Sequence, residues 1–287
     1  KQHPEFYTHN AKGEIIDPIN PETGKSWGWT DVADLNYDNK GLRDAMTSDM
    51  MYWVKDENID GFRCDVAGNV PTDFWQKTIP ELRKEKNIFM LAEAWEPELL
   101  KENLFDMCYN WDGHHTMNDI AQGKKNVSDW DKLMEAVSKK YEANDILMNF
   151  VDNHDENSWN GTMKSRLGNA EEAMTALSYL APGMPLVYSG DEYGLNHSLK
   201  FFEKDSIPKT KGKQWDWRAK LGKLKNENSA LNGGKKASKY TRISTSNDAK
   251  ILAFERSNDK SKVIYLANLT NASQLAIAKI EGNYVNY

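Results

Sequence analysis

Three carboxylates in this chain each follow a separate apolar run, at the point where the run ends. They are Asp65, Glu93 and Asp155, which follow runs that begin at residues 59, 88 and 146. Short apolar runs separated by helix-length segments are typical of successive parallel strands, whose carboxyl ends meet at the mouth of an α/β barrel. The spacing therefore predicts that the three acids lie at one active site.

Asp65 and Glu93 have different sequence neighbours, which suggests different chemical roles. Arg63 lies two residues before Asp65, so on a strand both side chains point to one face, where the guanidinium holds the carboxylate ionised for nucleophilic attack. Glu93 has no cation next to it in sequence, and its neighbours are apolar. This setting favours the protonated form of a general acid. Two such acids and a third carboxylate suit a retaining glycoside hydrolase, whose nucleophile and acid/base lie about 5 Å apart.

Two other interpretations fit the same residues. In a purely structural interpretation, Arg63 and Asp65 form an ion pair at a barrel rim. Glu93 then caps the next segment, and His154-Asp155 is an ordinary loop dipeptide. In a metal-site reading, the acids at the strand ends hold a divalent cation, but Arg63 would compete with the metal for the carboxylates. The recurrence of an acid at three strand ends favours catalysis.

Strand-like and helix-like segments alternate through most of the chain. The strand-like segments are 59–65, 87–93, 104–110, 146–152 and 184–192, and the helix-like ones are 41–57, 72–85, 129–142 and 169–181, with a shorter segment at 97–103. This order predicts an α/β fold, a partial (β/α)8 TIM-type barrel of about five βα units. The β-rich runs at 251–256 and 262–269 predict part of an antiparallel β domain after it.

Changes in composition divide the chain into three parts. Residues 1–40 are rich in Pro and Gly, which predicts an ordered excursion loop after the third barrel strand. Residues 41–230 are the partial catalytic barrel, and residues 231–287 are an all-β C-terminal domain. An open sheet of five strands has unpaired edges, so association through exposed barrel edges is expected.

The motifs around the three acids resemble, in order, the second, third and fourth signature regions of the α-amylase family of glycoside hydrolases. The matching stretches are 61–65, 91–95 and 150–155, with further similarity at 31–36 and 188–194. The resemblance implies that Asp65 is the nucleophile, Glu93 the acid/base and Asp155 the transition-state stabiliser. It also implies hydrolysis of α-1,4-glucosidic bonds in starch-like glucans or maltooligosaccharides through a covalent glycosyl-enzyme intermediate.

Candidate substrate-binding residues surround the acids. The resemblance implies that Arg63 partners the nucleophile and that His154 binds sugar. Trp29 and Trp95 are candidates for stacking, because planar rings pack against the apolar faces of sugars. Asn69 stands where many family members have a histidine, and it is the candidate for sugar contact on the product side.

The chain also departs from the family pattern. The first signature region, Asp-x-x-x-Asn-His, has no counterpart before residue 30, so a chain that lacks the first three barrel strands and stops short at Tyr287 is expected. Some family members bind calcium through the loop region that this chain is expected to lack. The resemblance therefore allows Ca²⁺ in a complete enzyme, but this chain does not support a calcium site. No metal ligand is assigned, and no cofactor is expected to be required.

Two alternatives to hydrolysis remain open at this stage. One is an α-glucan transglycosidase, in which a sugar hydroxyl replaces water at the same covalent intermediate. The other is a catalytically inert glucan-binding fragment of such an enzyme, in keeping with the missing strands.

Composition argues against several other partners. The net charge of −6 provides no field that would attract nucleic acid or an anionic membrane, and no run of about 18 apolar residues is present to span a bilayer. Cys64 and Cys108 lack metal or redox spacing and are expected to be buried free thiols. From family habit, a periplasmic or extracellular location is expected over a cytoplasmic one.

Overall fold

The computed structural model describes residues 3–20, 23–29 and 31–287. The chain divides into two compact units, Lys1–Asp106 and Met107–Tyr287. The three predicted parts follow other boundaries, at residues 40 and 230, and they stay predictions.

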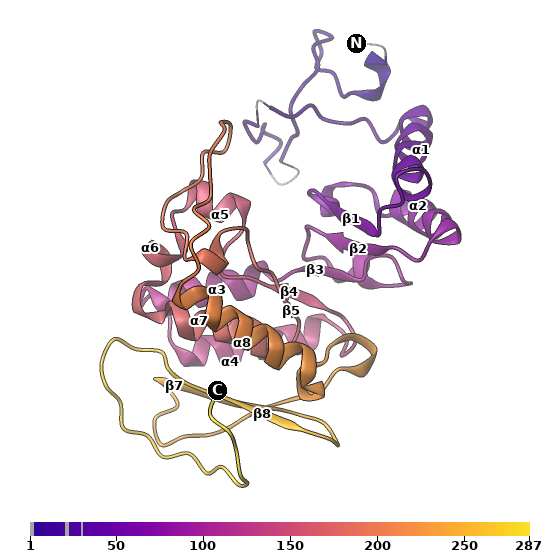
Figure 1. Ribbon diagram of the computed structural model, residues 1–287. Helices are drawn as coiled ribbons and strands as arrows, with labels where there is room; N and C mark the ends of the chain where they lie inside the picture. Colours follow the sequence, from indigo (N-terminus) through magenta and orange to yellow (C-terminus); the bar gives the residue numbers. More distant parts are fainter. Residues whose placement is uncertain (1–2, 21–22, 30) are drawn as a thin grey trace. The chain divides into compact units, whose positions relative to one another are not determined.

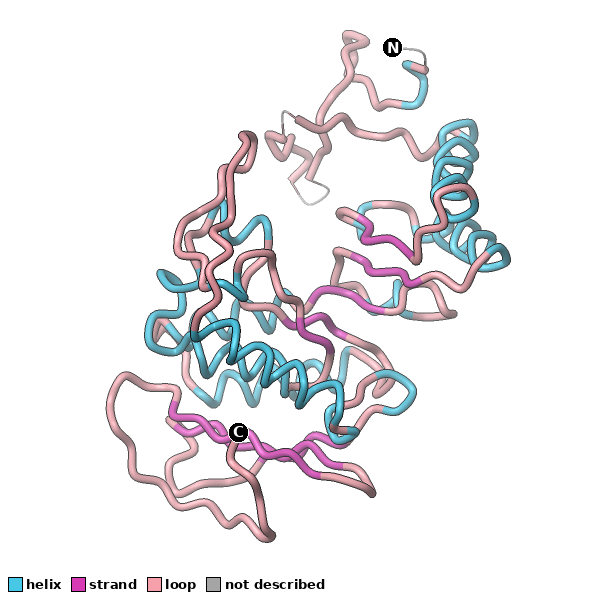
Figure 2. The backbone as a smooth tube through the Cα atoms, viewed as in Figure 1, coloured by secondary structure: helices cyan, strands magenta, loops and turns pink. Residues whose placement is uncertain are grey.

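The first unit starts with a long irregular segment, as the Pro and Gly content predicts. Figure 2 shows the described chain before α1 as loop apart from one short helical turn near the N-terminus, and isolated bridges such as Tyr7 with Leu35 hold this part together. Its elements are η1 (Pro4–Phe6), α1 (Lys40–Lys55), β1 (Gly61–Cys64), η2 (Ala67–Asn69), α2 (Thr72–Glu85), β2 (Phe89–Ala92) and η3 (Pro97–Leu100), where η denotes a 3₁₀ helix.

Helices α1 and α2 pack against each other in this unit. The Asn39 side chain caps α1 by accepting the Leu42 N–H at 3.2 Å, and the hydroxyls of Thr47 and Thr78 bond across the helix pair at 2.7 Å. The fully buried core side chains beside them include Phe74, Ile79, Leu82 and Met90. Burial of these apolar faces, rather than helix propensity, holds the pair together.

Strands β1 and β2 pair in parallel, in a register that runs from Gly61–Phe89 to Cys64–Ala92. Gly61 has φ 155°, and a Cβ at this position would lie 1.9 Å from the carbonyl oxygen of Phe89. Only glycine lets the two backbones approach this closely. This residue therefore sets the spacing of the strands that precede Asp65 and Glu93.

The second unit contains parallel strands, a set of helices and an antiparallel sheet. Parallel pairing joins β3 to β4 and β4 to β5. Its elements are β3 (Met107–Tyr109), α3 (Trp111–Ala121), α4 (Val127–Lys140), β4 (Leu147–Asn149), α5 (His154–Trp159), α6 (Met163–Leu167), η4 (Gly168–Ala170), α7 (Glu171–Leu180), β5 (Met184–Pro185), η5 (Asp191–Tyr193), α8 (Lys213–Glu227), η6 (Ser229–Leu231), η7 (Gly234–Lys236), β6 (Lys239–Arg242), β7 (Ile251–Ser257) and β8 (Lys262–Asn268).

One hydrophobic core joins the antiparallel sheet to the helices of this unit. It includes Trp130 of α4, Leu177 of α7, Leu221 of α8, and Phe254 and Tyr265 of the sheet. Figure 1 shows β7 and β8 lying along the layer formed by these helices. The C-terminal strands therefore share their core with the helices that precede them.

A buried arginine joins the same two layers. Arg256 of β7 is 1% exposed, and its guanidinium donates to the carbonyl oxygens of Leu180 at 3.1 Å, Asn232 at 3.1 Å and Ser238 at 3.4 Å. Burial lowers the pKa of Arg256 to about 10. Its contact with Leu180 places a cation at the C-terminal end of α7, where the helix dipole favours positive charge.

The predicted fold class is confirmed: parallel strands in βα order, a partial TIM-type barrel, precede an antiparallel sheet. Each of the five predicted parallel strands is present but shorter than expected. The run at 184–192 keeps only β5, because Pro185 has no N–H donor for the ladder and the chain turns at Gly190. The predicted runs at 251–256 and 262–269 are β7 and β8. Both cysteines are buried and free, as predicted. Helices α3, α5 and α6 and strand β6 were not predicted.

Candidate active site

Asp65 and Glu93 lie one residue beyond the ends of two paired strands. The pairing of Cys64 with Ala92 closes the β1–β2 ladder, and the Glu93 N–H extends it by donating to the Cys64 carbonyl at 3.0 Å. The two acidic residues therefore leave the sheet side by side at its carboxyl edge, as the strand pattern predicts.

The Arg63 guanidinium contacts both carboxylates. It forms an ion pair with Asp65, and its Nη2 lies 3.1 Å from Glu93 Oε1. The expectation that Glu93 has no neighbouring cation is therefore wrong, because the cation comes from the paired strand and not from the residues next to Glu93 in sequence. The Asp65 side chain is 72% exposed and that of Glu93 is 14% exposed, so the two acids still differ in access to water.

Solvent access, more than charge, thus distinguishes the two acids. When both are ionised, the pair with its guanidinium keeps one negative charge, and uptake of one proton neutralises it. Glu93 is the less exposed of the two acids, and shielding from water suits it to proton exchange with a bound substrate.

The residue after Asp65 has a strained backbone. Val66 is in the left-handed region, with φ 42° and ψ 44°, which costs a β-branched residue on the order of 1–3 kcal/mol. Its N–H donates to Glu93 Oε2 at 2.8 Å, and the Ala67 N–H donates to the Glu93 carbonyl at 3.1 Å. The strained turn ties the Asp65 segment to Glu93, and no sequence pattern reveals it.

A groove of about 700 Å³ opens beside Asp65 within the first unit. Two predicted sugar-contact residues, Trp29 and Asn69, line it. Trp29 stacks on Trp27, with the ring centroids 5.3 Å apart. Much of the remaining lining is apolar and includes Tyr37, Met46, Met50 and Trp75. A carboxylate beside aromatic and apolar surface is the composition that a sugar-binding groove requires.

Trp95 lies two residues after Glu93 and is 51% exposed. The backbone N–H of Trp95 donates to Glu96 Oε2 at 2.9 Å. The same carboxylate covers Gly68, where an added Cβ would come within 2.7 Å of it. The structure therefore brings the Gly68-Asn69 segment against the segment that carries Trp95.

Asp155 and His154 form the first turn of α5 in the second unit. The Asn153 side chain caps this helix, because its Oδ1 accepts the N–H groups of Asp155 at 3.0 Å and Glu156 at 2.7 Å. His154 Nε2 lies 3.4 Å from Asp155 Oδ2, and both side chains remain partly exposed. Convergence of Asp155 with the two acids of the first unit stays a prediction.

A buried ion pair lies close to this turn in sequence. Asp152 is 2% exposed, and Arg166 Nη2 lies 2.7 Å from its Oδ1. Burial, with the nearby charge of Asp191, raises the pKa of Asp152 to about 7. Sequence reasoning missed this pair, although Asp152 belongs to the same motif as Asp155.

A second buried contact holds α5 in place. Glu156 Oε2 lies 3.1 Å from His114 Nε2. Burial opposes the charge of Glu156, but its contacts with His114 hold the pKa of that carboxyl below its usual range. Asn118 Nδ2 also lies 3.2 Å from His114 Nε2. These side chains position the helix that carries Asp155.

A sequence model of the α-amylase catalytic domain matches residues 27–261. The chain belongs to the α-amylase family. The resemblance predicted from the motifs around the three acids is therefore confirmed.

Individual members of the family show the extent of the match. The chain is 26% identical over 273 residues to the intracellular maltogenic amylase of Bacillus subtilis (strain 168), covering 90% of this chain and 45% of the relative. It is 31% identical over 180 residues to a 4-α-glucanotransferase of Thermotoga maritima, covering 56% of this chain and 37% of the relative. The solved structure of the maltogenic α-amylase AmyB from Thermotoga neapolitana matches with a TM-score of 0.80 and 25% identity, over 93% of this chain and 60% of that one. The chain thus spans less than two thirds of the length of each relative.

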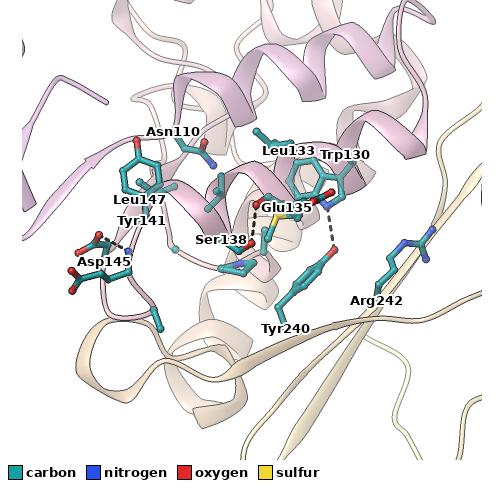
Figure 3. Close-up of a pocket in the computed structure, with 17 residues that line it drawn as sticks. Asn110, Trp130, Leu133, Glu135, Ser138, Tyr141, Asp145, Leu147, Tyr240 and Arg242 are labelled. Carbon is teal, nitrogen blue, oxygen red and sulfur yellow. Dashed lines mark hydrogen bonds between the residues drawn. The ribbon is translucent and has the colours of Figure 1, made fainter. Parts of the chain in front are cut away.

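This α-amylase-family chain has another pocket, of about 500 Å³, which none of the predicted site residues lines. Figure 3 shows side chains of α4 on one side and Tyr240 and Arg242 of β6 on the other. The Trp130 indole N–H donates to the Tyr240 hydroxyl at 3.3 Å, and Arg242 Nε donates to Asp131 at 2.9 Å. The polar groups at this wall thus bond to one another, and the pocket lies between α4 and the C-terminal sheet.

The described part of the chain offers neither a metal-binding cluster nor a membrane-spanning helix. Among the described residues, no group of three or more His, Cys, Asp or Glu side chains is placed to hold a metal ion. None of the helices in residues 3–20, 23–29 and 31–287 is long and apolar enough to cross a bilayer. The expectation that no cofactor is required stays a prediction.

Proposed function

We propose that the chain carries the acids of a retaining α-glycosidase that hydrolyses α-1,4-glucosidic bonds in starch-like glucans or maltooligosaccharides. Asp65 is the nucleophile, Glu93 the acid/base and Asp155 the stabiliser of the oxocarbenium-like transition state. The observation that carries the proposal is the Arg63 guanidinium in contact with both Asp65 and Glu93. A retaining pair needs its two carboxyl groups about 5 Å apart, and a cation in contact with both side chains supports such close spacing.

The reaction proceeds in two displacements. First, an Asp65 oxygen attacks the anomeric carbon while Glu93 gives its proton to the glycosidic oxygen, which leaves as a hydroxyl of the departing sugar. Then Glu93, now a carboxylate, takes a proton from water, and the water oxygen displaces Asp65 from the same carbon. Each displacement inverts the carbon, so the product keeps the starting configuration.

Arg63 faces one negative charge in each of these states. Before reaction Asp65 is ionised and Glu93 is protonated. In the covalent intermediate Asp65 is an uncharged ester and Glu93 is the carboxylate. Because the guanidinium contacts both side chains, it pairs with the charge without moving as the charge passes from one to the other.

The other predicted site residues have sugar-binding roles in this proposal. Trp29 and Trp95 offer ring faces for stacking on glucose units. Asn69 lines the groove beside Asp65 and supplies an amide for sugar hydroxyls. His154 lies next to Asp155 on α5 and provides a ring nitrogen for the same purpose.

Transglycosylation is the second candidate function. It is favoured by the 31% identity to a protein named 4-α-glucanotransferase and by the apolar lining of the groove, which disfavours water as the acceptor. The covalent intermediate is common to both reactions. Product analysis at high maltooligosaccharide concentration distinguishes them, since transfer yields chains longer than the substrate.

Reducing-sugar release from soluble starch tests the leading proposal. We expect turnover by the parent chain, loss of at least 10³-fold in Glu93→Gln, in line with removal of an acid/base group, and near-parent turnover in Glu98→Gln, an exposed acid of η3 that serves as the matched control. A fluorinated glucosyl fluoride should leave a stable ester on the peptide that contains Asp65, detected by mass spectrometry. Folded chain with neither turnover nor ester would refute the proposal and leave the inert glucan-binding alternative.

Compartment and association complete the proposal. The Bacillus subtilis relative is named an intracellular enzyme, whereas the expectation for this chain is periplasmic or extracellular; fractionation of native cells decides between them. Association through exposed strand edges also stays a prediction, and light scattering on the purified chain tests it.

A further inference from the structure

An Asn-Gly pair, Asn232 and Gly233, follows η6 in the second unit. The Asn232 backbone is extended, with φ −63° and ψ 148°, and Gly233 is exposed to water. An added Cβ at Gly233 would meet nothing within 4 Å. In an Asn-Gly pair the peptide nitrogen of the glycine can attack the side-chain amide of the asparagine, because glycine has no Cβ to crowd that nitrogen.

The carbonyl oxygen of Asn232 accepts two hydrogen bonds. The Arg256 guanidinium donates to it through Nη2 at 3.1 Å, and the Ser238 backbone N–H donates to it at 3.1 Å. Burial lowers the pKa of Arg256 to about 10, so the guanidinium is still protonated at neutral pH. The same peptide group carries the Gly233 N–H. Donors to its oxygen stabilise the negative charge that forms there when the nitrogen loses its proton, and they make that nitrogen a better nucleophile.

A second buried cation lies next to this peptide group. Lys225 Nζ donates to the carbonyl oxygen of Leu231 at 2.9 Å and to that of Gly183 at 2.7 Å. Burial and the charge of Arg256 lower the pKa of Lys225 to about 7. In the described part of the chain, no carboxylate is among the groups that shift the pKa of either cation. Two buried cations without an acidic partner therefore bind successive carbonyls, a setting that favours a new negative charge.

The sequence has one other Asn-Gly pair, Asn160 and Gly161, and its contacts differ. The Asn160 side chain is engaged, because its Nδ2 donates to Glu156 Oε1 at 3.1 Å. The neighbouring guanidinium, that of Arg166, donates to the Gly161 carbonyl at 3.0 Å, so it acts on the following peptide group and not on the one that carries the Gly161 N–H. This pair is therefore an internal reference for the reaction at Asn232.

We propose that Asn232-Gly233 is a self-modification site, at which the chain converts Asn232 to aspartate and isoaspartate through a cyclic imide. The Gly233 nitrogen gives up its proton, and its electron pair forms a bond to Asn232 Cγ. The side-chain nitrogen takes up a proton and leaves as ammonia. Water then opens either carbonyl of the imide and leaves a carboxylate at residue 232. The reaction needs no reagent besides water, and it adds one negative charge beside Arg256, the residue that joins the C-terminal sheet to α7.

Ageing of the full chain in mildly alkaline buffer tests the site. Peptide mapping by mass spectrometry follows the amide-to-acid mass gain at each Asn-Gly pair, and an isoaspartyl methyltransferase labels the isoaspartate. In the folded chain we expect Asn232 to react at least about tenfold faster than Asn160, the effect of one charge-assisted hydrogen bond. In concentrated urea the two rates should agree within about twofold, because the contacts that distinguish the two pairs are lost.

Two variants separate the contributions of the residues. Gly233→Ala should slow the reaction at Asn232 at least about tenfold, because the added methyl group crowds the attacking nitrogen, and it should leave the fold unchanged. Gly222→Ala, in α8, is the matched control, because an added Cβ there also meets nothing within 4 Å; it should leave the rate at Asn232 unchanged. Arg256→Lys keeps a cation but loses the planar guanidinium, so the rate at Asn232 should fall towards that at Asn160.

Three results would overturn the proposal. They are equal rates at Asn232 and Asn160 in the folded chain, a ratio of these rates no larger than in urea, or an unchanged rate at Asn232 in folded Arg256→Lys. If circular dichroism shows that Arg256→Lys does not fold, the comparison of the two pairs in the parent chain decides alone. None of these measurements uses turnover, so failure of the hydrolase proposal leaves the test intact.

Discussion

Gly61→Ala should separate the two strands that carry the catalytic acids. The added Cβ would lie 1.9 Å from the Phe89 carbonyl oxygen, 2.7 Å from its carbon and 2.8 Å from its nitrogen. All three are backbone atoms, so no side-chain rotation relieves the overlap. An ordinary contact needs more than 3 Å, and β1 must therefore move more than 1 Å away from β2 or lose its register.

The expected cost combines two effects. Overpacking against a rigid neighbour costs about 1–3 kcal/mol, and each backbone hydrogen bond lost from the β1–β2 ladder adds about 1 kcal/mol. We therefore expect the free energy of unfolding to fall by about 3–5 kcal/mol. The same displacement moves Asp65 away from Glu93, so turnover by any folded fraction should fall as well.

Urea unfolding, followed by tryptophan fluorescence and far-UV circular dichroism, measures this change. Gly222→Ala is the control, because this glycine lies in α8 and an added Cβ meets nothing within 4 Å. Alanine is the better helix former, so the control should gain about 0.5–1 kcal/mol. A Gly61→Ala chain within 1 kcal/mol of the parent would refute the close approach of β1 and β2.

Three further predictions concern buried charges and metals. Arg256→Met should lower the free energy of unfolding by about 3–5 kcal/mol, because it leaves buried carbonyls without donors. Urea unfolding measures the change, with Lys139→Met, which removes an exposed cation, as the control. Equal stability of the two variants would contradict the prediction. The pKa of Asp152 in the folded chain, about 7, exceeds its value in the unfolded chain, so the protonated side chain contributes its full stabilisation below about pH 4 and loses it as the pH rises through 7. From pH 5 to 8 the free energy of unfolding of the parent should therefore fall by about 2–4 kcal/mol relative to that of Asp152→Asn. Parallel profiles of unfolding free energy against pH for the two chains would disprove this. Melting temperature should be equal within 1 °C in EDTA and in calcium chloride, since no described cluster fits a metal; a calcium-dependent rise above about 5 °C would reveal a site.

The sequence predicts elements well where a local pattern decides them. The runs that end at Asp65 and Glu93 contain β1 and β2, and residues 72–85 match α2. Helix α3 was missed because Gly113 and its polar neighbours weaken the helical signal. Strand β6 was missed because its residues, Lys239–Arg242, are short and polar, and only pairing with β7 makes them a strand.

The candidate site likewise has some features that the sequence indicates and others that only tertiary contacts determine. The places of Asp65 and Glu93 follow from where the strands end, which the sequence indicates. The contact of Arg63 with Glu93 joins residues 30 positions apart and depends on the register of β1 with β2. The left-handed Val66 has no signal either, because valine is a poor residue for that conformation and only the surrounding contacts impose it.

The core that Phe254 and Tyr265 share with α7 bears on how this region can be recombined. Exchanging the C-terminal strands with those of a relative would bring in side chains shaped for another helix. A hybrid would need the matching face of α7, including Leu177, together with the carbonyl at Leu180 that receives Arg256. The unit of exchange in protein engineering is therefore the sheet together with its supporting helix, because a crossover placed between them would pair apolar faces shaped for different partners.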